Sequence, residues 1–504
     1  MARYHALLAA YIASAATYSA CLLAPASATE PPAPGVQWPS IDIAERFQSF
    51  TTRRGFINLT RTVVANRIAL SSGIIKAEEA SAKGGTMISG RKSIPVLLLK
   101  FSDTVAEPYP VADLQKELFE TWPSGTMTDF YRELSYGQFT VDGTVYPWTA
   151  VSQKAGYYEG KINDNNPCNG LCSTNRLGEL LKEVLDAANK SIDFSQYDND
   201  GPDGIPNSGD DDGYVDFVAF VHPGRGGECG SQDGQVNNNV WSHRYRLSDL
   251  TGKDYETKDL AKDGRRIRID DYVIMPALAC DGHKMIQIGV FAHEFGHAFG
   301  LPDLYDTKRP PRSQGVGNWD LMGAGSWGGN DRSPHRPSHM AAWSKAFLGW
   351  VNPKVLTTNV QNAKLRPIER FPDVLRVNIS NDVYYLVEHR SQVGFDDSLT
   401  GPGLLLWRIN EALVRIGLLN NSVNADINNP GVYLVQADGA RDLDDIAKNN
   451  RGDAGDPFPG SAKKINVDNR TNPATVGKLA LCNVSLAADS ASLDVRATDG
   501  NCPH

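Results

Sequence analysis

Residues 293–303 read HEFGHAFGLPD, a pattern that can hold a metal ion and use it for hydrolysis. His293 and His297 are four residues apart, so on a helix their imidazoles lie on the same face, as two zinc ligands require. Glu294 follows the first histidine and can reach a metal-bound water as a general base. An HExxH motif alone also occurs by chance, so the residues that follow it decide the interpretation.

The third metal ligand is predicted at Asp303. Gly300 permits the sharp turn that ends the helix, after which Asp303 can return toward the metal. One large class of zinc peptidases uses instead a Glu on a later helix. The first Glu after the motif is Glu369, which lies beyond the apparent domain boundary. Asp306 and Asp320 are the alternative carboxylates.

Apolar patterns predict the elements that position this motif. Helical periodicity covers Ile286–Phe299, and a second helix is expected to begin near Thr126 and to end near Gly137. Continuous apolar runs of strand type occupy Ile94–Phe101 and Val215–Val221. Beyond residue 355 the pattern changes to short strand-like runs, at 383–388, 403–409 and 431–436. The expected fold class is therefore α+β, with a peptidase catalytic domain followed by a β-rich C-terminal domain.

The first residues have the pattern of a secretory signal peptide. Arg3 precedes an apolar run from Ala6 to about Leu23, and Ala26-Ser27-Ala28 is a small-x-small cleavage site. A membrane anchor is the alternative, but polar residues interrupt the run, and no later stretch is apolar enough to span a bilayer. The predicted organisation is a signal peptide at 1–28, a propeptide at 29–90, a catalytic domain at 91–354 and a β-rich domain at 355–504.

Composition limits the classes of partner. The chain has 504 residues, 41% of them hydrophobic and 22% charged, with a formal net charge of -9. These proportions are typical of a soluble globular protein of several domains. The acidic balance argues against a nucleic-acid partner, which would need a basic face, and it is compatible with bound divalent cations.

Removal of the signal peptide leaves six of the seven cysteines. An even set in an exported chain indicates disulfides, although spacing does not settle their connectivity. Metal thiolates are the weaker alternative, because only one pair is closely spaced. We predict that neighbours pair, as Cys168–Cys172, Cys229–Cys280 and Cys482–Cys502.

Residues 198–216 (DNDGPDGIPNSGDDDGYVD) form an acidic, turn-rich segment. Calcium prefers six to eight oxygen ligands, which such a loop can supply, although the spacing is not that of an EF-hand. A solvated acidic loop is the alternative. The candidate calcium ligands are Asp198, Asp200, Asp203, Asp210, Asp212 and Asp216.

Several segments together resemble the immune inhibitor A family of secreted metallopeptidases. They are PVLLLKFSD (95–103), GTMTDFYRELSYGQF (125–139), DGYVDFVAFVHPG (212–224), VWSHR (240–244), HEFGHAFGLPDLYD (293–306), WDLMGAGSW (319–327) and NNRGDAGDPFPGS (449–461). The resemblance implies a metzincin-like catalytic domain, one catalytic zinc, structural calcium and a removable prosegment. Trp407-Arg408-Ile409-Asn410 departs from the family pattern, in which a histidine is expected, and this puts in doubt any role carried over to that strand.

Met322 lies in the Gly-rich segment 318–327, which is similar to the Met turn beneath the zinc of metzincin-like peptidases. An ordinary core methionine is the alternative. Four further residues could donate a hydrogen bond that stabilises the transition state: Tyr305, His243, His335 and His339. A role as an ordinary core or surface residue is the simpler interpretation of each. The tripeptide Arg451-Gly452-Asp453 is interpreted as a structural turn rather than an adhesion motif.

The predicted function is that of a secreted zinc endopeptidase with Glu294 as general base, which acts on protein or peptide substrates and has no stable membrane insertion after signal removal. Two other classes stay open. One is a secreted binding or adhesion protein that has lost activity, which the intact residues His293, Glu294, His297 and Asp303 oppose. The other is a zinc hydrolase of non-peptide bonds.

Overall fold

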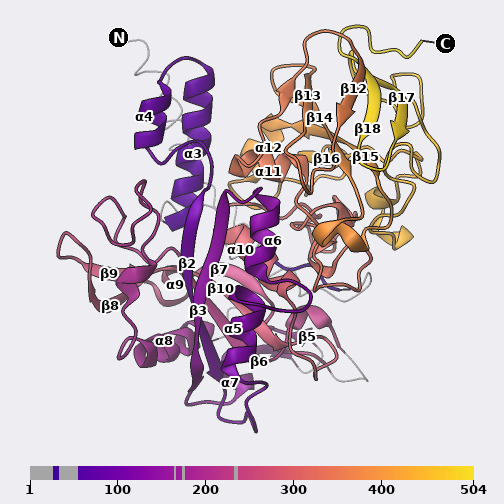
Figure 1. Cartoon of the computed structure of the whole chain (residues 1–504). Helices are drawn as coiled ribbons and strands as arrows, with labels where there is room; N and C mark the ends of the chain where they lie inside the picture. The colour runs from indigo at the N-terminus through magenta and orange to yellow at the C-terminus, as the bar shows by residue number, and fades with distance from the viewer. Residues whose placement is uncertain (1–26, 33–54, 164–165, 173–175, 232–235, 504) are drawn as a thin grey trace, which may run out of the picture.

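The computed structural model describes residues 27–32, 55–163, 166–172, 176–231 and 236–503. The predicted signal peptide therefore lies outside the described residues except for Ser27 and Ala28. The fold combines α-helices and β-strands, with a six-stranded sheet in one half and smaller sheets in the other (Figure 1). No helix among the described residues is long and apolar enough to cross a membrane.

The six-stranded sheet has the order β1-β7-β10-β6-β2-β3. Its strands are β1 (Ser27–Ala28), β2 (Gly90–Lys100), β3 (Phe139–Ala150), β6 (Val218–Arg225), β7 (His243–Arg246) and β10 (Asp271–Leu278). The strands β3, β2, β6 and β10 are parallel, whereas β7 is antiparallel to β10 and β1 is antiparallel to β7. The strand predicted at 94–101 is confirmed as β2, and the run at 215–221 becomes a strand only from Val218.

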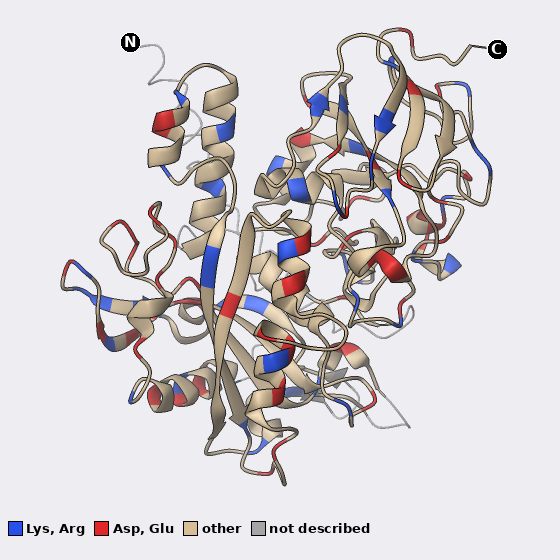
Figure 2. Cartoon of the chain, in the orientation of Figure 1, with Lys and Arg blue, Asp and Glu red and all other residues tan. Residues whose placement is uncertain are grey.

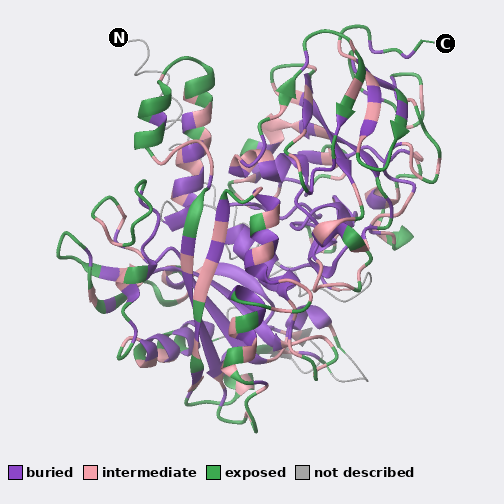
Figure 3. Ribbon diagram, viewed as in Figure 1, coloured by how far each residue is buried: buried purple, intermediate pink, exposed green. Residues whose placement is uncertain are grey.

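Both faces of this sheet are buried, which explains why its strands are continuously apolar. Along β2, Val96 and Leu98 join the core that contains α5 (Val111–Phe119), α6 (Met127–Leu134) and α10 (Ile288–Ala298). Leu97 and Leu99 point to the opposite face, where they share a second core with α8 (Leu177–Ala188). The central strands and α10 are accordingly buried in Figure 3.

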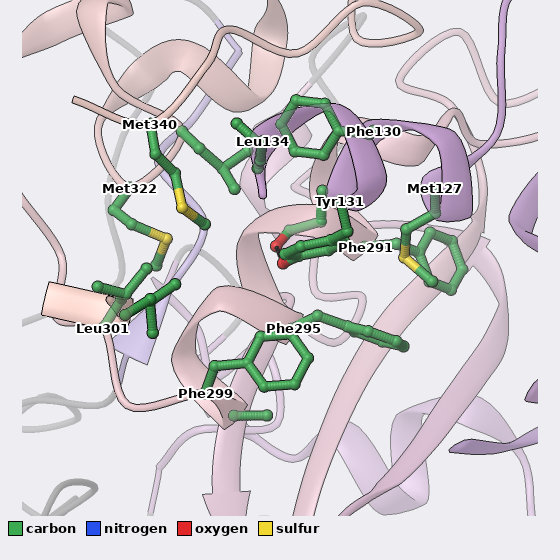
Figure 4. Close-up of a cluster of buried hydrophobic side chains, with 14 of the residues drawn as sticks. Met127, Phe130, Tyr131, Leu134, Phe291, Phe295, Phe299, Leu301, Met322 and Met340 are labelled. Carbon is green, nitrogen blue, oxygen red and sulfur yellow. Dashed lines mark hydrogen bonds between the residues drawn. The ribbon is translucent and has the colours of Figure 1, made fainter. Parts of the chain in front are cut away.

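The predicted helix near residue 126 is confirmed as α6. The Thr126 hydroxyl accepts a hydrogen bond from the Asp129 backbone N–H at 3.0 Å, and the Asp129 carboxylate accepts one from the Thr126 N–H at 3.1 Å. This reciprocal capping box satisfies two backbone donors that a helix start leaves unpaired. Its buried face includes Phe130 and Tyr131, which pack beside α10 in Figure 4.

The helices α3 (Gly55–Ser71) and α4 (Ala77–Ala82) form a separate hairpin-like unit beside the sheet (Figure 1). The Phe56 ring of α3 contacts Phe217 and Phe299, with centroid distances of 5.9 and 5.3 Å. The Thr60 hydroxyl donates to the Phe299 carbonyl at 2.7 Å. Both helices lie within the segment predicted as a propeptide, and α3 is anchored near the end of α10.

The remaining short elements are peripheral or connect the two halves. They are α7 (Ala155–Glu159), β4 (Lys161–Asn163), β5 (Asn166–Pro167), α9 (Leu247–Thr251), β8 (Tyr255–Leu260), β9 (Arg266–Ile269) and α11 (Ala342–Leu348).

The C-terminal part is β-rich, as predicted. A five-stranded sheet contains β11 (Lys354–Val355), β13 (Leu375–Asn378), β14 (Val383–Arg390), β15 (Gly403–Asn410) and β16 (Val432–Leu434). A three-stranded sheet contains β12 (Val360–Leu365), β17 (Ala480–Leu486) and β18 (Ala491–Arg496), and α12 (Glu411–Gly417) follows β15. The strands predicted at 383–388, 403–409 and 431–436 are β14, β15 and β16.

The five-stranded sheet belongs to two cores at once. In β15, Leu404 and Leu406 face the core shared with the three-stranded sheet, whereas Leu405 and Trp407 face the core that contains α10. This alternation follows from the two-residue period of a strand. The C-terminal β-rich part is therefore continuous with the hydrophobic interior of the first half. Trp407, at the position that departs from the family pattern, is buried and donates to the Glu388 carboxylate at 2.7 Å.

A buried ionic network also joins the two halves. The Arg390 guanidinium lies 2.6 Å from the Asp396 carboxylate, 3.5 Å from Glu369 and 3.7 Å from Glu388, and all four side chains are fully buried. Arg390 also donates to the Trp319 carbonyl at 3.0 Å. The contact to Trp319 links β14 directly to the half that carries α10.

The three disulfides pair as predicted: Cys168–Cys172, Cys229–Cys280 and Cys482–Cys502. Disulfides of this kind are typical of proteins in oxidising compartments. Charged side chains of both signs are interspersed over both halves of the molecule in Figure 2, in agreement with a net charge of -9 that is spread along the chain.

Replacement of Arg390 by Met should lower the free energy of unfolding by about 3–5 kcal/mol, because it leaves buried carboxylates without their cation. The matched control is Arg366→Met, which removes a surface ion pair with Asp373 in which the Arg side chain is 51% exposed and should cost less than about 1 kcal/mol. Urea unfolding of both variants measures the difference. Equal losses would show that the buried network does not stabilise the fold more than a surface pair.

Candidate metal centre

The helix α10 carries His293, Glu294 and His297, and all three side chains are fully buried. The helix ends as expected: Gly300 has a φ of +93°, a conformation that L side chains rarely adopt, and the Leu301 N–H donates to the Gly296 carbonyl at 3.0 Å. The chain then turns back along the same end of the helix and brings Asp303 beside the two histidines.

Three ligand atoms converge at this point. The Asp303 Oδ1 lies 3.2 Å from His293 Nε2 and 3.1 Å from His297 Nε2, and the two Nε2 atoms are 3.1 Å apart. Tetrahedral zinc with bonds of about 2.0 Å places its ligand atoms roughly 3.3 Å from one another. The triangle of donor atoms therefore has the size and the chemistry that a zinc ion requires.

Hydrogen bonds on the outer side fix the orientation of each ligand. His293 Nδ1 donates to the Leu321 carbonyl at 2.9 Å, and His297 Nδ1 donates to the Leu301 carbonyl at 2.8 Å. With the protons on Nδ1, both Nε2 atoms keep a lone pair for a metal, which is the usual role of such outer contacts.

Asn421 holds the third ligand from the C-terminal half. Its side-chain N–H donates to Asp303 Oδ2 at 2.6 Å, and its carbonyl oxygen accepts from the Asp303 backbone N–H at 2.8 Å. Asn421 is buried and has a φ of +52°, a conformation that asparagine tolerates better than most residues. No motif in the sequence marks it, since it lies 118 residues from Asp303 in a segment with no other signal.

Burial and charge perturb both carboxyl groups of the site. Burial raises the pKa of Glu294 to about 8, although the neighbouring His293 lowers it. Burial also opposes ionisation of Asp303, but the adjacent histidines hold the pKa of that carboxyl well below its usual range. Asp303 is thus the anion of the site, and Glu294 is a group that can exchange a proton near neutral pH.

Glu294 faces a segment from the N-terminal part of the chain. Its Oε1 accepts from the Thr29 backbone N–H at 3.1 Å and from the Thr29 hydroxyl at 2.5 Å. Its Oε2 is buried and has no hydrogen-bond partner among the described residues.

The two alternative carboxylates serve other purposes. Asp306 accepts from the backbone N–H groups of Lys308 and Arg312, at 3.0 and 2.8 Å. Asp320 accepts from the Met322 N–H at 2.5 Å and from the Ala341 N–H at 2.6 Å. Both side chains therefore order loops, and neither joins the group of three ligand atoms found in the described part of the chain.

Met322 lies directly beneath the helix that carries the histidines. A Cβ on Gly296, between the two histidines of the motif, would come within 2.5 Å of the Met322 Sδ. The Met322 carbonyl also accepts from the Leu304 N–H at 2.8 Å. Figure 4 shows Met322 beside Leu301 and Met340.

The other candidate donors differ in their surroundings. Tyr305 is buried beside Asp303, where burial raises the pKa of the phenol well above its usual value. His243 is buried and contacts Tyr272 and the Trp241 carbonyl, at 2.9 and 2.7 Å. His339 contacts Glu133 and Lys345, and His335 is partly exposed. The contacts of His243 and His339 are those of structural residues, and His335 is a surface residue. Of the four, only Tyr305 lies beside Asp303.

The acidic loop brings together only some of the predicted calcium ligands. Carboxylate oxygens of Asp198, Asp200 and Asp212 all lie within 4.8 Å of one another. Burial, followed by mutual repulsion, raises the pKa of Asp198 to about 8 and that of Asp200 to about 7. An oxygen of Asp198 and one of Asp216 are buried without a hydrogen-bond partner among the described residues.

The other predicted ligands are not members of this group of three. Asp203 accepts from the Ile205 N–H at 2.8 Å, and Asp210 accepts from the Asp203 N–H at 3.2 Å. Asp216 accepts from the Asn199 N–H at 3.0 Å through its other oxygen. The contact between Asp203 and Ile205 forms a turn, whereas the other two link residues 7 and 17 positions apart in the chain.

Two histidines and a carboxylate, all buried, form a ligand set consistent with a zinc site. Beside them lies a glutamate with one oxygen that has no hydrogen-bond partner among the described residues. Residues 111–351 match the family described as "Immune inhibitor A peptidase M6, catalytic domain". The chain thus carries a catalytic domain of the M6, or immune inhibitor A, peptidase family, and the resemblance seen in the sequence is confirmed.

Two curated relatives agree with this assignment. The chain is 30% identical over 301 residues to the pre-pro-metalloprotease PrtV of Vibrio cholerae serotype O1, an alignment that covers 55% of this chain and 30% of PrtV. It is 31% identical over 217 residues to immune inhibitor A of Bacillus thuringiensis subsp. alesti, which covers 40% of this chain and 29% of that protein. The chain therefore matches about 30% of the length of these relatives.

Proposed function

We propose that this protein is a secreted, metzincin-like zinc endopeptidase that hydrolyses peptide bonds in proteins. The observation that carries the proposal is the meeting of His293 Nε2, His297 Nε2 and Asp303 Oδ1 at 3.1–3.2 Å, next to the partner-free oxygen of Glu294. Family membership supports peptidase chemistry, and the three disulfides support an extracellular location.

In this proposal His293, His297 and Asp303 hold the zinc, and the set leaves a fourth position open. When bound, the metal supplies Lewis-acid chemistry, which polarises the scissile carbonyl and makes a water more acidic. Glu294 takes a proton from the attacking water at its Oε2 and later delivers it to the leaving nitrogen. A pKa raised by burial suits a group that must both accept and release a proton.

Two other functions make different predictions. An inactive binding protein would cleave no protein substrate, although Glu294 and all three ligands are present. A hydrolase of non-peptide bonds would bind zinc and also leave proteins intact. Casein hydrolysis that a chelator blocks and zinc restores separates the proposed function from both.

The proposal includes the four-part organisation of the chain. Residues 1–28 are the signal peptide, and 29–90 are a propeptide that keeps the enzyme latent until it is removed. The contact of Thr29 with Glu294 and the packing of Phe56 against Phe299 support this role. The catalytic domain at 91–354 and the β-rich domain at 355–504 then form the mature enzyme.

We also propose that the acidic loop binds calcium through Asp198, Asp200 and Asp212. The buried oxygen of Asp198 that lacks a hydrogen bond supports this assignment, because an unpaired buried carboxylate oxygen is costly unless a cation compensates it.

Glu294→Gln should keep its zinc and lose peptide hydrolysis by about two to four orders of magnitude, the usual contribution of a positioned acid/base. Zinc content and melting temperature of the purified variant serve as controls for folding and metal binding. Near-normal turnover by a correctly folded variant would show that another group moves the proton.

Zinc content should discriminate between the neighbouring carboxylates. Asp303→Ala should lose zinc on dialysis, whereas Asp306→Asn should keep it, because Asp306 only orders a turn. Asn421→Gly removes the amide that holds Asp303 and still fits a positive φ, so it should weaken zinc binding by about 10–100-fold. Full occupancy in Asp303→Ala, or loss only in Asp306→Asn, would contradict the ligand assignment.

Calcium should stabilise the protein more at pH 8 than at pH 5. The pKa values of Asp198 and Asp200 are raised to about 8 and 7 in the folded protein, so the metal-free fold binds more protons than the unfolded chain from about pH 4 to pH 8. Its stability therefore falls as pH rises through that window, and a bound cation cancels the loss.

Melting temperatures with and without millimolar calcium, at a fixed buffered zinc concentration, measure this effect. Asp200→Asn should reduce the calcium response, whereas Asp203→Asn, in the same loop but outside the group of three, should retain it. A calcium response that is equal at the two pH values and in both variants would remove this site from the proposal.

A further inference from the structure

Residues 27–32 lie where an extended peptide substrate would be expected to bind. Ser27 and Ala28 pair antiparallel with Arg244 and His243 of β7, which would otherwise be the free edge of the six-stranded sheet. Extended peptides commonly bind proteins by adding a strand to such an edge. The Thr29 N–H continues the pairing by donating to the Ser242 carbonyl at 3.3 Å.

Backbone contacts fix the register of this segment relative to Glu294. The Thr29 nitrogen lies 3.1 Å from Glu294 Oε1, which is where a leaving nitrogen must lie to receive a proton from that carboxyl group. The indole N–H of Trp241 donates to the Thr29 carbonyl at 2.9 Å, and that of Trp327 donates to the Glu30 carbonyl at 2.7 Å. These contacts involve only peptide groups or the catalytic carboxylate, so a peptide of any sequence can make them.

The Glu30 side chain, in contrast, makes a contact that depends on charge. Its Oε1 lies 3.1 Å from Arg451 Nη2, and the two side chains are only 4% and 2% exposed. Arg309 also attracts this carboxylate, whereas Asp331, which lies 3.4 Å from Arg451 Nη1, and Asp303 repel it. Arg451 is the cation that compensates the buried charge of Glu30 most directly.

The position of Arg451 is fixed by its backbone as well as by side-chain contacts, which include a hydrogen bond from its Nε to Gln314 at 3.4 Å. Its carbonyl accepts from the Asn318 N–H at 2.7 Å, and a Cβ on the following residue, Gly452 (φ +128°), would come within 2.6 Å of the Trp319 ring nitrogen. The turn that presents Arg451 is therefore packed against the catalytic half. Since Arg451 is buried, the tripeptide 451–453 is not presented as an adhesion motif, as the sequence indicated.

We propose that Arg451 is a specificity-determining residue that binds an acidic side chain two residues beyond the scissile bond of the substrate. The position follows from the register: if the Thr29 nitrogen marks the leaving nitrogen, Thr29 is the first residue after the bond and Glu30 is the second. The inference rests on the proposed peptidase function. Loss of a buried charge partner costs enough that discrimination against an uncharged analogue should be at least about tenfold.

The test uses the chain as it is secreted, with its N terminus determined first. Peptides based on residues 27–32, lengthened by alanines and blocked at both ends, carry Glu, Asp, Gln or Lys at the second position after the bond. Mass spectrometry identifies the bond that is cut, and cut sites in casein give an independent profile. We expect kcat/KM to fall from Glu to Gln by at least about tenfold, with Lys lower still.

Three variants link this preference to Arg451. Arg451→Gln should abolish the preference for Glu over Gln, Arg451→Lys should retain part of it, and Arg332→Gln, an exposed neighbour of Asp331, should leave it unchanged. Melting temperatures show that each variant is folded. A preference for Glu that survives in folded Arg451→Gln, or no preference at that position in the unchanged enzyme, would overturn the inference.

If the secreted form still contains residues 29–32, the same contact is tested within the chain. Glu30→Gln should loosen the segment and raise turnover of short peptides several-fold, whereas Glu78→Gln, on the exposed face of α4, should have no effect. Equal peptide turnover in the unchanged protein, Glu30→Gln and Glu78→Gln would count against the proposed binding of an acidic side chain by Arg451. Failure to cut either casein or peptides after residues 29–90 have been removed would instead refute the proposed function, so the two failures are distinct.

Discussion

A buried carboxylate is stable only when its charge is compensated and its oxygens have donors, and Asp303 obtains these from two distant parts of the chain. Its Oδ1 lies between the imidazoles of α10, and its Oδ2 accepts from Asn421. The candidate metal centre therefore depends on the docking of the C-terminal half, because Asn421 makes two of the hydrogen bonds that orient Asp303. The five-stranded sheet stabilises this docking, since one of its faces belongs to the core that surrounds α10.

The same logic applies to the network around Arg390. A guanidinium buried among three carboxylates contributes little net stability compared with an apolar core, but it tolerates few alternative arrangements. Because Arg390 also donates to the Trp319 carbonyl, the network fixes the segment that continues into Met322. The support beneath the histidines and the amide that orients Asp303 are thus positioned by one rigid unit.

The parts of the site that could be predicted from sequence are local. His293, Glu294 and His297 share one helix, and Gly300 and Asp303 follow within a single turn, so spacing and helix geometry suffice. The pairing of neighbouring cysteines was also predicted correctly, although the two cysteines of the Cys229–Cys280 disulfide are 51 residues apart. The strands of the two halves were recognisable from apolar runs, but a run such as LLLW at 404–407 does not reveal that alternate residues enter two different cores.

The parts of the site that could not be predicted from sequence are contacts between residues far apart in the chain. Asn421 lies 118 residues from Asp303, and Arg451 lies 421 residues from Glu30, and neither belongs to a motif with a known polar role. The acidic loop shows a related limit, because composition suggested six ligands whereas Asp203 and Asp210 accept hydrogen bonds from backbone N–H groups of the loop. Polar side chains in loops have several competing partners, and only the folded backbone decides among them.

The N-terminal segment shows how recognition of a peptide divides between backbone and side chain. The peptide groups of Thr29 and Glu30 are held by Glu294 and two indole N–H groups, which would bind many sequences equally, and the Thr29 hydroxyl adds one side-chain contact to Glu294. Discrimination by charge arises where a side chain enters a buried site that contains an opposite charge. Arg451 provides such a charge, and because it belongs to the turn that packs on Trp319, the C-terminal half contributes to the choice of substrate as well as to the metal centre.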